Sequence, residues 1–83
     1  MEDLPGIVAL NLRRLRRERG FTQEELANVA DIDRSYLGTI ERAEYSITVV
    51  TLGKLAVALR VPPATLLELP SSHPFLAELA KGG

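Results

Sequence analysis

The chain has 83 residues, a formal net charge of −1, 46% hydrophobic residues and only 5% aromatic ones. This length allows one domain, near the lower size limit for a chain that folds alone. With no cysteine and one histidine, the chain has no disulfide framework, no thiolate metal site and no metal site made of histidines. No signal peptide or membrane-spanning run is recognisable, so we expect a cytoplasmic protein without metal or cofactor.

The first predicted helix stops at Gly20, and its Val8, Leu12 and Leu15 follow one stripe of a 3.6-residue period. Its second half, residues 13–19, reads RRLRRER. This run supplies the local basic surface that nucleic-acid binding needs. A solvated helix also favours cations in its last turn, so both interpretations stay open.

Four later segments share a pattern that marks helix starts: an apolar residue, a capping residue, and a second apolar residue four positions after the cap. The clearest is Phe21-Thr22 with Leu26, where Glu25 completes a capping box. The pattern recurs at Ile32-Asp33-Leu37, Ile47-Thr48-Leu52 and, more weakly, Val61-Pro62-Leu66.

These signals predict an all-α, five-helix domain over residues 1–69 and a short C-terminal extension over residues 70–83. The helices after the first are expected at residues 23–30, 34–42, 49–60 and 63–67. Gly53 lies inside the fourth, where glycine costs roughly 1 kcal/mol relative to alanine. We expect it to let another helix approach closely.

The helix at residues 34–42 has an unusual exposed side. Leu37 and Ile40 define its buried side, with Tyr36 and Glu41 on the flanks. The opposite side carries Arg34, Ser35, Gly38, Thr39 and Arg42. Only three residues separate this helix from the preceding one, which predicts the crossed pair of a helix-turn-helix unit.

In such a unit the second helix enters the DNA major groove. Arg34 can then donate two hydrogen bonds to guanine, and Ser35 and Thr39 can bond to bases or phosphates. Gly38 would let the backbone approach the groove. An arginine in the first turn opposes the helix dipole, so stability alone would not select Arg34. Ser35 and Thr39 also suit any exposed helix.

Residues 8–69 resemble the phage-repressor and Cro-like helix-turn-helix proteins, also called the XRE family. The matching stretches are LRRLRRERGFTQEELA, DRSYLGTIER and TLGKLAVALRVPPATLLEL. Within this family the chain looks closest to the controller proteins of restriction-modification systems. The resemblance implies a sequence-specific, dimeric transcriptional regulator that binds double-stranded DNA, with base reading by Arg34, Ser35 and Thr39.

The resemblance also implies other roles. Gln23 would contact a DNA phosphate, with Tyr36 and Arg42 near the DNA backbone. Arg16 would pair with Glu41, an arrangement that the helical wheel also allows, although two separately solvated charges are the alternative.

The sequence departs from the family pattern at two turns. Asp31 stands where glycine is frequent, and it tolerates a positive φ less well than glycine does. Ala43 and Glu44 stand where glycine and basic or asparagine residues are frequent. Glu44 would be repelled by phosphates, which puts phosphate contacts by this loop in doubt.

A homodimer is expected because one short helix reads few base pairs, whereas two-fold symmetry places half-sites about 10 bp apart. The expected interface is the fifth helix and the tail: Leu66, Leu67, Leu69, Phe75, Leu76 and Leu79.

RNA polymerase is a further candidate partner. The alternative function is an antitoxin-type or adaptor-type module whose main partner, such as a toxin, is a protein. No catalytic arrangement can be assembled from the sequence, and His73 is expected in a solvated loop.

Overall fold

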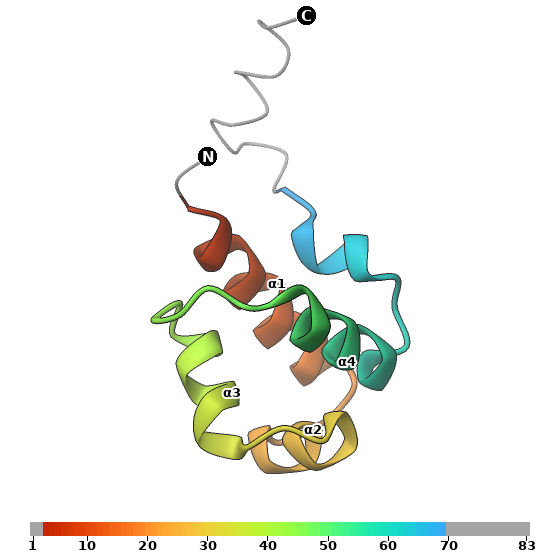
Figure 1. Cartoon of the computed structure of the whole chain (residues 1–83). Helices are drawn as coiled ribbons and strands as arrows, with labels where there is room; N and C mark the ends of the chain where they lie inside the picture. Colours follow the sequence, from red (N-terminus) through yellow and green to blue (C-terminus); the bar gives the residue numbers. More distant parts are fainter. Residues whose placement is uncertain (1–2, 70–83) are drawn as a thin grey trace, which may run out of the picture.

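The computed structural model describes residues 3–69, which form four α-helices and one 3₁₀ helix (Figure 1). The helices are α1 (Leu4–Glu18), α2 (Gln23–Ala30), α3 (Arg34–Glu41), α4 (Val49–Leu59) and the 3₁₀ helix η1 (Pro63–Leu67). Residues 3–69 contain no strand, as predicted. The predicted tail positions Phe75, Leu76 and Leu79, and also His73, lie outside the described residues.

The fifth helix differs from the prediction, because it is a 3₁₀ helix and not an α-helix. It has five residues and begins with a proline, and Pro62 before it offers no capping side chain. So short a segment gains little from α-helical hydrogen bonds, and 3₁₀ geometry is common in such pieces. The buried Asn11 fixes η1 to α1, since its Nδ2 donates to the carbonyl oxygens of Leu66 at 3.0 Å and Glu68 at 2.9 Å.

The three predicted side-chain caps are confirmed. Thr22 accepts a hydrogen bond from the backbone N–H of Glu25, whose side chain in turn accepts one from the Thr22 N–H. Asp33 caps α3 and Thr48 caps α4 in the same way, by accepting from a backbone N–H of the first turn. Each cap satisfies donors that the helix itself leaves unpaired.

All four α-helices end in the same turn, in which one residue has a positive φ. These residues are Gly20, Asp31, Ala43 and Arg60, with φ between 58° and 74°. After α2, the N–H of Ile32 donates to Ala27 O and that of Asp31 to Asn28 O, which is a Schellman motif. The predicted positive φ at Asp31 is therefore present.

Three of these turns have an apolar residue with two roles. Phe21, Ile32 and Val61 each follow the positive-φ residue of one helix and precede the cap of the next. All three pack against the core. The core is formed mainly by aliphatic side chains of all five elements: Val8, Leu12, Leu15, Leu26, Ala27, Ala30, Leu37, Ile40, Leu52, Leu55, Ala56, Leu59 and Leu66.

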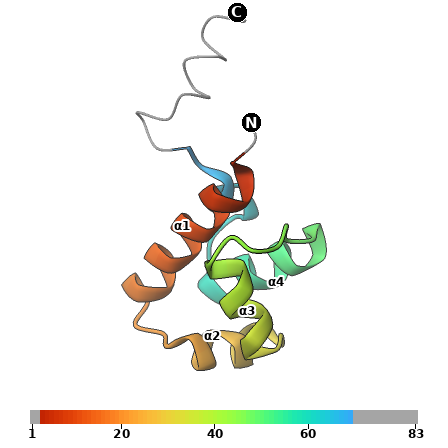
Figure 2. The same cartoon turned by 90° about the vertical axis from the view of Figure 1, so that its left-hand side faces the viewer.

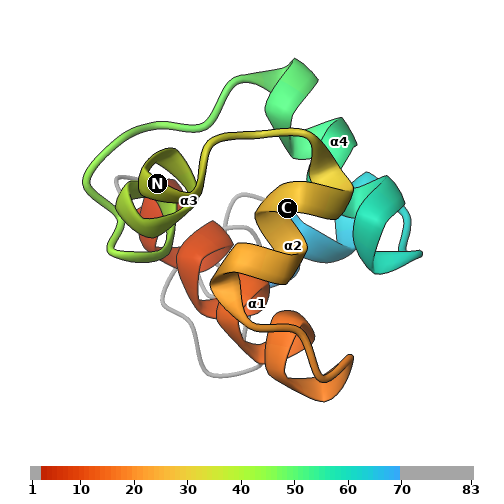
Figure 3. The same ribbon diagram turned by 90° about the horizontal axis from the view of Figure 1, so that it is seen from below.

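The packing leaves one side of α3 uncovered. The helix α1 packs against α3 and η1, and α2 packs against α3 and α4. Figure 2 shows α3 at the front of the molecule, with no other described element over its outward side. In Figure 3 α3 is seen nearly end-on while α2 lies across the view, so the two helices cross steeply.

The expectation for Gly53 is wrong for residues 3–69. A Cβ atom built at Gly53 would have no heavy atom of the described chain within 4 Å, so no helix of the same domain approaches it. The helical cost of this glycine is not offset by close packing within the domain.

Ala43 and Gly20 provide a matched test of the positive-φ turns. A left-handed conformation costs a non-glycine residue about 1–2 kcal/mol. Replacing Ala43 (φ 59°) by glycine should raise the free energy of unfolding by about 0.5–1 kcal/mol after the entropy cost of glycine. Gly20→Ala should lower it by a similar amount, since open space surrounds the new methyl group. Urea unfolding followed by circular dichroism measures both, and a destabilised Ala43→Gly would contradict the explanation.

Candidate nucleic-acid interface

The turn Asp31-Ile32-Asp33 sets the second helix of the pair, α3, across the first, α2. Leu37 and Ile40 anchor α3 in the core, with 0% and 2% of their surface exposed. The opposite side of α3 is therefore held outward by a rigid base.

Two of the predicted base-reading residues lie free on this outward side. Arg34 and Ser35 are exposed in the first turn of α3. Among residues 3–69, neither side chain has a hydrogen-bond partner, while Asp33 accepts from the backbone N–H of Ser35 at 3.0 Å. Their donors are available to another molecule.

Thr39 is more restricted. Its hydroxyl donates to the carbonyl oxygen of Tyr36 at 2.6 Å, and the residue is half-buried. The hydroxyl proton is thus occupied, and Thr39 can offer only an acceptor lone pair and a methyl group. Tyr36 is itself half-buried and packs against the core.

The expectation that Gly38 lies open on the outward side is wrong, because Gly38 is buried. The side chain of Arg42 lies close to it: a Cβ atom built at Gly38 would be 3.2 Å from Arg42 Nη1. Glycine at this position leaves room for the guanidinium of the chain's own Arg42.

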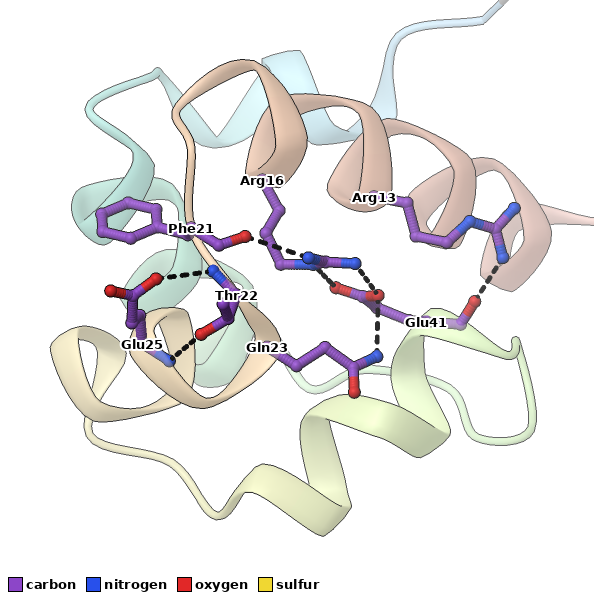
Figure 4. Close-up of polar contacts among 7 residues, drawn as sticks. All are labelled: Arg13, Arg16, Phe21, Thr22, Gln23, Glu25 and Glu41. Atoms are coloured by element: carbon purple, nitrogen blue, oxygen red, sulfur yellow. Dashed lines mark hydrogen bonds and ion pairs between the residues drawn. The ribbon is translucent and has the colours of Figure 1, made fainter.

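Behind α3 lies a polar network that joins three helices (Figure 4). The structure brings Arg16 and Glu41 together, with Nε to Oε2 at 2.7 Å and Nη2 to Oε1 at 3.1 Å. The Glu41 side chain is 2% exposed and the Arg16 side chain 12%. This is a shielded pair, whereas the sequence placed Glu41 only at a flank. Arg16 also donates to Phe21 O at 3.0 Å, which fixes the turn before α2.

Gln23, expected at a DNA phosphate, belongs to this network. Its Nε2 donates to Glu41 Oε1 at 3.0 Å. An amide nitrogen has two hydrogens, so one hydrogen and the amide oxygen remain for another partner. Gln23 thus links the buried pair to the start of α2.

Sequence reasoning missed two polar residues on α1 whose hydrogen bonds hold other elements in place. Arg13 Nη1 donates to the backbone oxygen of Glu41 at 2.6 Å and satisfies a carbonyl at the end of α3. Its position three residues before Arg16, on the same side of α1, was an available signal. Asn11 is the second, and a polar residue inside an apolar stripe was its signal.

Arg42 forms an exposed ion pair with Glu44, from Nε to Oε2 at 2.9 Å and from Nη2 to Oε1 at 3.1 Å. The hydrogen bond from Arg42 lowers the pKa of the Glu44 carboxyl, and the one to Glu44 raises the pKa of the Arg42 guanidinium. Because the pKa of Glu44 is lower in the folded chain than in the unfolded chain, the ion pair stabilises the fold at any pH above the unfolded-state pKa. This stabilisation is lost as the pH falls through the folded-state pKa. The pair is therefore intact at neutral pH.

Other kinds of site find no support in residues 3–69. They hold no cluster of histidine, cysteine or acidic side chains that could bind a metal ion. None of the described helices is long and apolar enough to cross a membrane. A short helix, a tight turn and a crossed second helix with free polar donors form a helix-turn-helix unit, the arrangement by which many proteins bind DNA.

Residues 12–66 match the helix-turn-helix family HTH_3, and the chain belongs to this family. It is 40% identical over 72 residues to the HTH-type transcriptional regulator SutR of Escherichia coli (strain K12), a match that covers 87% of this chain but only 40% of that regulator.

Two solved structures are similar. The restriction-modification controller protein C.AhdI from Aeromonas hydrophila has 39% identity and a TM-score of 0.73, over 80% of this chain and 98% of that one. The hypothetical transcription factor NHTF from Neisseria has 36% identity and a TM-score of 0.81, over 90% and 86%. The chain is a phage-repressor-like helix-turn-helix transcriptional regulator that binds DNA, and its family is not one of enzymes.

The Arg16–Glu41 pair gives a stability prediction with a built-in control. Arg16→Met leaves a buried carboxylate unpaired and should lower the free energy of unfolding by about 3–5 kcal/mol. The control is Arg14→Met, which removes the exposed Arg14–Glu18 pair and should change stability by less than about 1 kcal/mol. Thermal unfolding measures both. Equal effects of the two substitutions would contradict a structural role for the buried pair.

Proposed function

We propose that this chain binds a palindromic operator as a homodimer, with α3 of each copy in the major groove. The observation that carries the proposal is the contrast between the two sides of α3. Its inner side is fixed by the core and by the buried Glu41, and its outer side presents donors of Arg34 and Ser35 that have no partner among residues 3–69.

The proposed division of roles follows the chemistry of each side chain. Arg34 and Ser35 read base edges with their free donors, and Thr39 contributes its methyl group and an acceptor. Gln23 uses its second amide hydrogen on a phosphate, and Tyr36 and Arg42 lie near the DNA backbone. Phosphate contacts fix the position of the domain, and base contacts select the sequence.

The proposed dimer interface lies near the end of the described chain. Leu67 is 41% exposed and Leu69 is half-buried, so both can contact a second copy. Leu66 cannot, because its side chain is fully buried in the core of its own copy. Next to Leu67 is an open apolar pocket of about 300 Å³. It is lined by Leu4, Pro5, Val8, Ser46, Ile47, Thr48, Val49, Leu52 and Leu67.

One similar protein, C.AhdI, is named a restriction-modification controller protein, and a relative from Bacillus phage phi105 is named an immunity repressor. This supports operator binding by the present chain. A protein-interaction module of the same fold is the second candidate, favoured by the exposed valines Val49, Val50 and Val57 on α4.

The test of base reading is fluorescence anisotropy over a salt series, with one duplex from upstream of the chain's own gene and one scrambled duplex. A ratio of roughly 10³ or more between them establishes a specific regulator. Arg34→Ala should cost about 1–3 kcal/mol on the first duplex and relax base choice at one position. Gln23→Ala should weaken binding to both duplexes by similar factors. Equal losses for Arg34→Ala would refute base reading, and weak, equal binding by the unaltered chain would favour the protein-interaction module.

The dimer is tested by sedimentation at micromolar concentration. Leu67→Lys should weaken self-association at least about tenfold, because it places a charge in an apolar contact. Val57→Lys is the control, since Val57 is an apolar residue that is 78% exposed but does not line the pocket. A monomer with and without DNA, for the unaltered chain, would refute the dimer.

A further inference from the structure

The turn after α3 differs from the other three helix ends in one respect. The residue that follows the positive-φ position is apolar after α1, α2 and α4, but after α3 it is Glu44. Glu44 is exposed and does not pack in the core. Its backbone N–H already donates to Thr39 O at 3.0 Å, and that of Ala43 donates to Ile40 O at 3.0 Å. The main chain thus closes this turn without the carboxylate.

The Glu44 carboxylate instead occupies one edge of Arg42. Both of its oxygens accept from this edge, from Nε at 2.9 Å and from Nη2 at 3.1 Å. The remaining nitrogen, Nη1, lies over Gly38, where even a methyl group would be only 3.2 Å away. The edge held by Glu44 is one of the two edges with which arginine can bind two oxygens of a phosphate side by side, and the other edge includes Nη1.

Arg42 also lies on the same side of α3 as Arg34, a proposed base-reading residue. Residues 34, 38 and 42 are spaced by four and share one stripe of the helix. Both partners of the ion pair are about half exposed, with 58% of the Arg42 side chain and 51% of the Glu44 side chain accessible. A DNA backbone and Glu44 can therefore both reach this guanidinium, but the same edge cannot serve both at once.

We propose that Glu44 competes with DNA phosphate for Arg42 and thereby sets the overall affinity of the domain for DNA without affecting base choice. This proposal rests on the proposed DNA-binding role of α3. Binding replaces the two carboxylate hydrogen bonds of Arg42 by phosphate ones and leaves Glu44 as a negative charge beside the duplex. Both effects oppose binding to any sequence alike.

The test uses a random-sequence duplex of about 20 bp, because phosphate contacts do not depend on sequence. Glu44→Gln keeps the size of the side chain and removes its charge. It should tighten binding up to about fivefold, the range expected for release from an exposed ion pair. It should also steepen the slope of log K against log salt by up to about 0.9, the value of one additional phosphate contact.

Two matched variants isolate the competition from the change in net charge. Glu18→Gln removes the same charge from the exposed Arg14–Glu18 pair on α1 and should change affinity less than about twofold. In an Arg42→Ala background, Glu44→Gln should retain only the gain from removing a negative charge beside the duplex, which is smaller than its gain in the unaltered chain. Circular dichroism melts establish that all variants are folded.

The outcomes separate this proposal from the function on which it rests. If the unaltered chain binds the duplex but Glu44→Gln leaves binding unchanged or weaker, the competition is refuted and the DNA-binding role stands. The competition is likewise refuted if Glu44→Gln has its full effect in the chain that lacks Arg42. If the unaltered chain binds no duplex even at low salt, about 50 mM, both proposals are refuted.

Discussion

The buried carboxylate of Glu41 is the point on which the geometry of the domain depends. It accepts from Arg16 of α1 and Gln23 of α2 while belonging to α3, so one side chain joins three helices. Aliphatic side chains pack non-directionally and would tolerate small sliding of one helix on another. Charged hydrogen bonds are directional, and they fix how far α3 projects and how it is turned. The backbone oxygen of the same residue, held by Arg13, adds a second fixed point on α3.

The hydrogen-bond network connects the start of α2 with α3 through Gln23. Gln23 contacts Glu41 inside the domain and stands at the first position of α2 beside the proposed DNA surface. A phosphate bound by the second amide hydrogen of Gln23 would thus contact a side chain that is itself held by Glu41, the residue that orients α3. The proposed phosphate contact of Gln23 and the orientation of α3 therefore depend on the same carboxylate, that of Glu41.

The helix starts and the core positions were predictable from the sequence, because capping residues and apolar spacing are local patterns. Thr22 with Glu25, Asp33 and Thr48 determine the helix starts through chemistry confined to one turn. The errors came from contacts that local patterns do not encode. The burial of Gly38 depends on the path of the Arg42 side chain, and that path depends on Glu44 beyond the helix end. The burial of Leu66 depends on a distant asparagine, Asn11, that holds η1 against α1.

The double use of Phe21, Ile32 and Val61 limits how the length of the chain can change. Each residue closes one helix and opens the next, so an insertion or deletion there would move an apolar side chain out of the core. The connection from α3 to α4 is free of this constraint, because Glu44 does not pack in the core and two residues, Tyr45 and Ser46, separate it from Ile47. Among the described turns, this loop is where the fold can best accept extra residues. Since it begins beside Arg42, variation in loop length would alter the proposed contact of Arg42 with the DNA backbone, while the spacing of the proposed base-reading residues on α3 stays the same.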